Sequence, residues 1–330
     1  MTVTSHDVAR LAGVSQATVS RALRDDARVT ASTRARVRQA AATLGYVPSE
    51  LGRGLSTRTT RRVALVVELH NTLYHQLMAP IHDELAGRGY RMSLLAERDD
   101  VSVIDRLLDR SVDGAILMTT RVGDSLPDEL SRRGLPFVFL NRLGSLADAP
   151  SVSADNLAGA EAAGTLVLDS GHRDIGVILG PADTSTSRDR EAGFRRAFEL
   201  AGVPWSSAQI VRGEFDHESG RVGVRELVEG GAPPTAVLCA NDHIAIGALS
   251  EAAAVGRRVP DELAVVGFDD IDMASWPAFR LTTVHNPLLE MAARAAAMLL
   301  DAIETPDTTV DHVVFPTSLV LRATHGDNHS

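Results

Sequence analysis

The 330-residue sequence predicts an α/β protein with a small helical head, and three observations lead to this fold class. Charge is unevenly divided: residues 1–62 carry 11 Arg and four acidic residues, a balance of +7, whereas the rest carries 22 Arg and 39 acidic residues, a balance of −17. The first 46 residues show helical spacing. From residue 63 onward, apolar runs alternate with helical patterns. A basic head on an acidic body indicates a nucleic-acid-binding module joined to a second domain, with a merely solvated basic surface as the alternative.

Three short helices are predicted in the head. Thr4 begins a capping-box pattern, and Gly13 ends the first helix. Ser15 and Thr30 are suited to cap the second and third helices, the last of which stops at Gly45. Apolar residues share one face of each helix: Val8, Leu11, Ala12, Val19, Ala22, Leu23, Val37, Ala41 and Leu44. Two helices joined by a tight turn form a helix-turn-helix, whose second helix enters the DNA major groove.

This placement gives the polar residues of the second helix a role in DNA binding. Gln16 and Ala17 open the helix, where they can touch base edges, and Arg21 can pair bidentately with a guanine. Short or basic side chains beside them suit phosphate contacts, which position the protein without reading sequence: Ser15, Thr18, Ser20 and Arg24, with Thr4 at the start of the first helix.

The rest of the chain predicts two doubly wound α/β lobes. Apolar runs without polar alternation suit buried parallel strands, and they lie at 63–67, 92–96, 114–118, 136–140, 175–179, 235–239 and 263–267. Helical patterns separate them at 77–88, 101–110, 187–201, 217–229 and 242–254. A helix at 287–303 and a strand at 312–316 follow the second lobe and could return to the first.

Paired lobes of this kind bind ligands between them, near the carboxyl ends of the strands. Asn141, Asn241 and Asp269 come just after predicted strands, and Arg190 lies near the start of a helix. Fixed amides, carboxylates and a guanidinium can hydrogen-bond the hydroxyls of a sugar-like ligand. As alternatives, Asp269 with its neighbour Asp270 could simply end a strand.

Arg190 has its own alternative, a surface ion pair with Asp189 or Glu191. The acidic residues could also bind a metal, but no His or Cys accompanies them at ligand spacing, so neither a metal nor a cofactor is predicted.

Several function classes are disfavoured. The chain has no Lys, which rules out a phosphate-binding G-x-x-x-x-G-K loop, and it contains no H-E-x-x-H, C-x-x-C or G-x-S-x-G motif. Its single cysteine, Cys239, cannot form an intramolecular disulfide and reads as a buried small residue. There is no run of 18 apolar residues and no secretion signal at the start. We therefore expect a cytoplasmic, nucleoid-associated protein that is not an enzyme and does not enter the membrane.

Specific motifs strengthen the regulatory interpretation. The run D-V-A-R-L-A-G-V-S-Q-A-T-V-S-R-A-L (7–23) and the segment L-G-Y-V-P (44–48) resemble the DNA-binding head of the LacI/GalR family of bacterial transcription regulators. Segments at 155–160, 169–181, 190–198, 240–249 and 265–270 resemble family motifs in family order, so the resemblance spans essentially the whole chain.

The resemblance implies a domain plan and a partner. The helix-turn-helix head covers 1–46, a hinge segment 47–60, and a periplasmic-binding-protein-like effector and dimerisation domain 61–330. Its first lobe is assigned to 61–153 and 285–311, and its second to 154–284 and 312–330. A homodimer is expected to bind a pseudo-palindromic operator. Leu55 matches the hinge leucine that wedges into the minor groove.

The resemblance also implies effector contacts. Arg190, Asn241, Asp269 and Asn141 fall on effector-contacting positions, and two aromatic residues match positions beside the ligand: Tyr74 and Phe215. Phe215 could instead belong to the core. A sugar or sugar derivative is the expected effector, with a nucleobase or nucleoside as the alternative. A soluble sugar-binding receptor without DNA regulation is the rival from another class.

Overall fold

The computed structural model describes residues 3–23, 25–46, 59–68, 73–96, 103–305 and 311–326. Two compact units are present, Met1–Thr60 and Arg61–Ser330. Most of the predicted hinge, including Leu55, lies outside the described residues, and so does Arg24.

The head contains three helices: α1 (Ser5–Ala12), α2 (Gln16–Leu23) and α3 (Ala31–Leu44). The expected caps are present. The Asp7 carboxylate accepts hydrogen bonds from the Thr4 N–H at 3.0 Å and from the Thr4 hydroxyl at 2.7 Å. Gly13 ends α1 in the left-handed region, with φ of 62°, where an L side chain would be strained.

Small residues dominate the core of the head, which buries Val8, Ala9, Ala12, Val19, Ala22, Val29, Val37, Ala40 and Ala41. Leu11 differs from the prediction, because its side chain is 53% exposed while Ala9 is buried. α1 packs against both α2 and α3, so its buried surface follows positions 8, 9 and 12 rather than one narrow stripe.

The larger unit holds two parallel sheets, as the alternating pattern predicted. The first has the order β11-β5-β4-β3-β1-β2, formed by β1 (Arg62–Val67), β2 (Arg91–Ala96), β3 (Gly114–Leu117), β4 (Phe137–Leu140), β5 (Ser151–Ala154) and β11 (His312–Phe315). The second has the order β7-β6-β8-β9, formed by β6 (Ile175–Leu179), β7 (Gln209–Arg212), β8 (Ala236–Cys239) and β9 (Ala264–Val266). We call these the sheets of the first and second lobe.

Helices cover both sheets. In the first lobe these are α5 (Leu73–Gly87), α6 (Val103–Leu108), α7 (Leu126–Arg133) and α12 (Leu288–Glu304). One face of the first sheet packs against α5 and α12, and the opposite face contributes to a second core with α6 and α7. The second lobe has α8 (Asn156–Asp169), α9 (Ser185–Leu200), α10 (His217–Glu229) and α11 (Asp242–Ala254). No helix among the described residues is long and apolar enough to span a membrane.

The predicted strands and helices do not include β5, β7 or α7, nor the short strands β10 (Thr283–His285) and β12 (Ser318–Val320). The strand at 312–316 was expected to be able to return to the first lobe, although the predicted lobe ranges assign it to the second. In the structure β11 pairs in parallel with β5, with His312 opposite Ser151. β11 is therefore the edge strand that completes the first sheet, and the chain returns to the second lobe only after β11.

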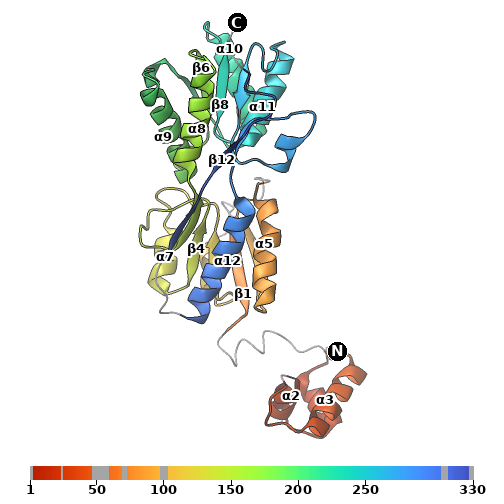
Figure 1. Cartoon of the computed structure of the whole chain (residues 1–330). Coiled ribbons are helices and arrows are strands. Elements are labelled where there is room, and N and C mark those ends of the chain that lie inside the picture. Colours follow the sequence, from red (N-terminus) through yellow and green to blue (C-terminus); the bar gives the residue numbers. More distant parts are fainter. Residues whose placement is uncertain are drawn as a thin grey trace. The chain divides into compact units, whose positions relative to one another are not determined.

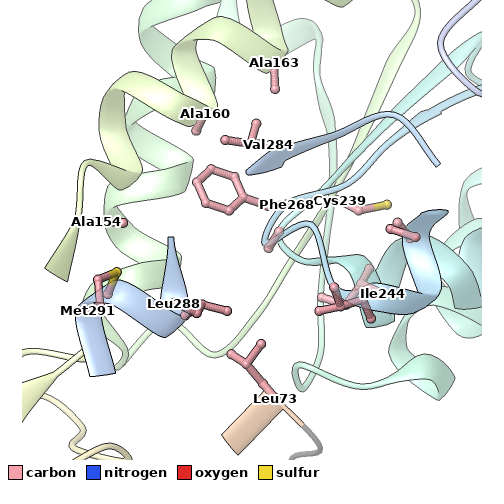
Figure 2. Close-up of a cluster of buried hydrophobic side chains, with 14 of the residues drawn as sticks. Leu73, Ala154, Ala160, Ala163, Cys239, Ile244, Phe268, Val284, Leu288 and Met291 are labelled. Atoms are coloured by element: carbon pink, nitrogen blue, oxygen red, sulfur yellow. The ribbon is translucent and has the colours of Figure 1, made fainter. Parts of the chain in front are cut away.

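The chain passes between the lobes at 154–156, 285–288 and 315–318. Between the lobes lies an antiparallel pair, β10 (Thr283–His285) and β12 (Ser318–Val320), and Figure 1 shows β12 at this junction. The junction is tightly packed: the Phe268 ring points toward Ala160 and Val284 (Figure 2). A Cβ added at Gly159 would lie 2.6 Å from Thr317 Oγ1 and 3.0 Å from the Phe268 ring.

Candidate functional site

A small cavity between the lobes gathers the residues predicted to contact an effector. It is lined by Leu73, Tyr74, Asn141, Arg142, Thr186, Arg190, Phe215, Asn241 and Asp269. All six predicted residues belong to this set, although they come from both lobes. Their contact with a ligand stays a prediction.

Strand ends explain why these side chains meet. Asn141 follows β4, Asn241 follows β8, and Asp269 comes shortly after β9, so each lies at the carboxyl edge of its sheet. Asn241 also caps α11, because its Oδ1 accepts from the Ile244 N–H at 2.9 Å. Asn141 and Asp269 have positive φ values of 69° and 107°. Strained backbone of this kind is concentrated at functional sites.

Arg190 organises the second-lobe side of the cavity. Its Nε donates to Asn156 Oδ1 at 2.8 Å, its Nη1 to the Ala240 carbonyl at 2.5 Å, and its Nη2 to Asp269 Oδ1 at 2.8 Å. The guanidinium also lies 3.7 Å from the centre of the Phe268 ring. Both charged side chains of the pair are almost fully buried, at 2% and 3% exposure.

The surface alternative for Arg190 is therefore wrong. Its carboxylate partner is Asp269 rather than Asp189 or Glu191, and Glu191 instead pairs with Arg212 at 2.5 Å. Asp269 likewise does more than end a strand, because it is the buried counterion of Arg190.

A second buried carboxylate belongs to Asp242, the residue that follows Asn241. Asp242 accepts from the Ile271 N–H at 2.9 Å and from the Thr283 hydroxyl at 2.5 Å. Burial raises its pKa well above the ordinary value, and the nearby charge of Asp269 raises it further. Asp242 is thus a protonation-sensitive part of the fold.

The first-lobe side is bonded differently. Asn141 Oδ1 and Arg142 Nη1 are buried and make no hydrogen bond to any described residue. The Arg142 guanidinium lies 5.2 Å from the centre of the Phe215 ring, while the Tyr74 hydroxyl donates to the Met118 carbonyl at 2.9 Å. Phe215 therefore belongs both to the edge of the core and to the cavity.

Sequence reasoning missed two polar residues of the cavity, Arg142 and Thr186. Arg142 directly follows Asn141 at the end of β4, so extending the search one residue beyond each strand end would have found it. Thr186 lies in the first turn of α9, one turn before Arg190, a spacing that places both on one helix face.

Contacts across the lobes border the same region. Arg121 of the first lobe lies 3.2 Å from both carboxylate oxygens of Asp183 of the second. The Val122 N–H donates to the Asp183 carbonyl at 2.7 Å, and the Leu143 N–H donates to Ser185 Oγ at 2.8 Å. These bonds hold the lobes together and would have to break if the lobes separated at this rim.

The head presents its predicted DNA-contacting residues on the surface. Ser15, Gln16, Ala17, Ser20 and Arg21 are exposed, as is Thr4 at the N-cap of α1, and Thr18 is half-buried. Three of them are oriented by neighbours: Gln16 Nε2 donates to Ser5 Oγ at 2.8 Å, and the hydroxyls of Ser15 and Thr18 lie 2.9 Å apart. Their contact with DNA also stays a prediction.

A helix-turn-helix head joined to a two-lobed α/β domain is the architecture of a DNA-binding transcription regulator with a ligand domain, and two family models match these parts of the chain. The family model for bacterial regulatory proteins of the lacI family matches residues 4–49, and that for a periplasmic binding protein-like domain matches 166–325. The chain belongs to the lacI family. In the part of the chain that the structure describes, no cluster of His, Cys, Asp and Glu could hold a metal ion.

Named relatives support this assignment. The chain is 33% identical over 307 residues to the HTH-type transcriptional repressor CytR of Escherichia coli K12, covering 91% of this chain and 90% of the relative. It is 34% identical over 326 residues to the HTH-type transcriptional regulator CelR of Thermobifida fusca, covering 96% of each. These relatives are transcription regulators rather than enzymes, which confirms the expectation that the chain is not an enzyme.

Solved structures agree. A CelR–cellobiose complex has a TM-score of 0.76 and 32% identity, covering 98% of this chain and 99% of that one. A Lac repressor dimer bound to operator and the anti-inducer ONPF has a TM-score of 0.88 and 26% identity, covering 99% and 100%. The predicted fold class, a helix-turn-helix head with a two-lobed effector domain, is thereby confirmed.

Proposed function

We propose that the chain represses transcription as a homodimer on a pseudo-palindromic operator, under the control of an uncharged, sugar-like effector held between its lobes. The observation that carries the effector site is the gathering of six predicted residues around one cavity, although they are scattered from Tyr74 to Asp269. The protein would act in the cytoplasm, associated with the nucleoid.

For DNA, the exposed face of α2 supports recognition by Gln16, Ala17 and Arg21, with Ser15, Thr18, Ser20 and Thr4 near phosphates. Two further residues of the proposed interface lie outside the described residues: Arg24, proposed to contact phosphate, and Leu55, in the proposed hinge at 47–60. A related solved structure is a Lac repressor dimer on its operator, and this supports a dimer here.

The second lobe offers a surface that suits such a dimer. A hollow of about 310 Å³ is lined by apolar side chains, including Leu249, Val259 and Phe279, together with polar groups of Arg257, Arg280 and Thr324. Trp276, next in sequence to this hollow, is 52% exposed, and Val255 is 42% exposed. Exposed apolar surface of this kind is typical of protein interfaces.

For the effector, the donors and acceptors of the cavity match hydroxyl groups, and related solved structures contain cellobiose and ribose. A nucleoside also carries sugar hydroxyls and is the second candidate. The receptor without DNA regulation is rejected, because the DNA-binding family model matches residues 4–49.

Entry of a ligand into the cavity requires the two lobes to move relative to each other. The cavity has a volume of only about 10 Å³, far below the roughly 300–1,000 Å³ typical of small-molecule sites. We infer that the lobes separate to admit a ligand and close on it, which breaks and remakes the Arg121–Asp183 contacts. DNA and ligand then bias one equilibrium, so each must change the affinity for the other.

The test combines operator selection with ligand screening. Full-length protein would select its operator from random DNA, and fluorescence anisotropy would then measure affinity with and without sugars and nucleosides. We expect two-fold symmetric operators and at least one compound that both changes operator affinity and raises the melting temperature. Selection of asymmetric DNA would contradict the dimer, and insensitivity to every compound would contradict a sugar or nucleoside effector.

A further inference from the structure

Two arginines of the cavity are equally buried but differ in their bonding. Arg190 is 2% exposed and Arg142 3%. Arg190 donates to three acceptors, whereas Nη1 of Arg142 makes no hydrogen bond to any residue that the structure describes. A buried charged donor without an acceptor destabilises the folded protein. Such a group therefore needs an explanation, and its position at a ligand cavity points to a donor kept for the ligand.

The surroundings of Arg142 hold the guanidinium without satisfying Nη1. The Glu68 Oε1 atom lies 3.5 Å away, beyond the 2.7–3.2 Å range of an N–H···O hydrogen bond. Glu68 is also shared with Arg121, whose Nη2 lies 3.7 Å from the same oxygen. The Phe215 ring adds an attractive cation–π contact, at 5.2 Å from the guanidinium carbon. Together they place the donor at the cavity wall, where no residue that the structure describes accepts a hydrogen bond from Nη1.

The neighbouring residue supplies the complementary group. Asn141 is 5% exposed and its Oδ1 accepts no hydrogen bond from any described residue. Both residues line the same cavity, so the first-lobe wall offers one unsatisfied donor and one unsatisfied acceptor. A hydroxyl group can satisfy both, because it accepts and donates. A carboxylate can satisfy only Arg142 and would bring a second negative charge beside Glu68.

We propose that Arg142 determines effector specificity by donating a hydrogen bond to a hydroxyl oxygen of an uncharged ligand, with Asn141 accepting from that hydroxyl or from an adjacent one. Arg190, whose Nε, Nη1 and Nη2 each already donate one hydrogen bond, holds Asp269 in position. This assignment rests on the proposed effector site, and it names the lobe and the side chain that select the ligand.

The first experiment needs no ligand and compares the two arginines in the full-length protein. Arg142→Met removes a buried, incompletely bonded charge, so its melting temperature is expected to equal or exceed that of the wild type. Arg190→Met removes three hydrogen bonds and leaves the Asp269 carboxylate buried without its counterion. Its melting temperature is therefore expected to be lower than that of the wild type by about 6 °C or more. An Arg142→Met protein that melts as low as Arg190→Met would overturn the proposal, because Arg142 would then be a structural ion-pair residue.

The second experiment measures specificity by isothermal titration of cellobiose, D-ribose, cytidine and D-glucuronate. For whichever uncharged probe binds the wild type, we expect at least tenfold weaker binding to Arg142→Met and partial recovery in Arg142→Lys. The sugars and the nucleoside separate the two possible sources of the hydroxyls. Equal affinity of the wild type and Arg142→Met, or preference for D-glucuronate, would contradict the role of Arg142.

The two experiments separate this inference from the function on which it rests. If none of the four probes binds the wild type, the proposed effector class fails, while the melting comparison still decides whether Arg142 is kept for a ligand. If a probe binds the wild type and Arg142→Met alike, the effector site stands and the role of Arg142 fails.

Discussion

Removal of the Asp269 carboxylate is the sharpest test of how the cavity is built. Asp269→Ala leaves the Arg190 guanidinium buried without its counterion, since both side chains are at most 3% exposed. It also removes the acceptor of a 3.1 Å hydrogen bond from Asn286 Nδ2. Breaking a buried pair by deleting one partner costs about 3–5 kcal/mol. At roughly 2–4 °C per kcal/mol, the melting temperature should fall by about 6–20 °C.

Two control variants make the reasoning specific. Asp269→Asn keeps an acceptor for Arg190 and Asn286 but loses the charge, so it should cost about 1–3 kcal/mol. The double variant Arg190→Met/Asp269→Ala removes both charges and should be much more stable than the sum of the single losses implies. Thermal unfolding of the full-length proteins measures all four corners of this cycle. An Asp269→Ala midpoint near that of the wild type, or additive losses, would refute the buried-pair account.

Three further changes test other parts of the molecule. Arg21→Ala should weaken operator binding by about 1–3 kcal/mol and relax one base position; anisotropy with unchanged base preference would reject this helix assignment. Gly220→Ala would place a Cβ 1.9 Å from the Ile244 carbonyl oxygen, so urea unfolding should show a free energy of unfolding lower by about 1–3 kcal/mol. The control Gly87→Ala has open space around its Cβ and should leave the free energy of unfolding unchanged. Burial raises the pKa of Asp242, so the contribution of this residue to stability is present at low pH and is lost as pH rises through that pKa. The wild type should therefore gain stability relative to Asp242→Asn as pH falls from 8 to 5. A stability difference that stays constant over this range would argue against a neutral Asp242.

The fold was largely predictable because its strands are continuous apolar runs. β6 and β8 are fully buried along their lengths, and buried parallel strands have this composition. β5 was missed because its sequence, S-V-S-A, alternates polar and apolar residues although all four are buried. β7 pairs only with β6 at one edge of its sheet and has alternating exposure, which makes a four-residue strand hard to tell from a loop.

The site was predictable as a set of positions but not as a set of bonds. Strand ends and family motifs marked Asn141, Asn241 and Asp269 without showing which groups are already satisfied. Arg190 and Asp269 are 79 residues apart in the sequence, so local reasoning offered only Asp189 and Glu191 as partners. The contrast between Arg190 and Arg142 depends on three-dimensional neighbours, and no spacing rule distinguishes a bonded guanidinium from an unbonded one.

The pairing of β11 with β5 has a consequence for biosynthesis. The paired residues Ser151 and His312 are 161 positions apart, so the edge of β5 stays open while the whole second lobe is translated. At roughly 5–20 residues per second, that interval lasts on the order of 10–30 s. The head, complete within the first 46 residues, can fold long before. During this interval a nascent chain carries a folded DNA-binding head and an exposed strand edge at the same time. Chaperones that shield such edges should therefore associate with ribosomes translating this part of the chain.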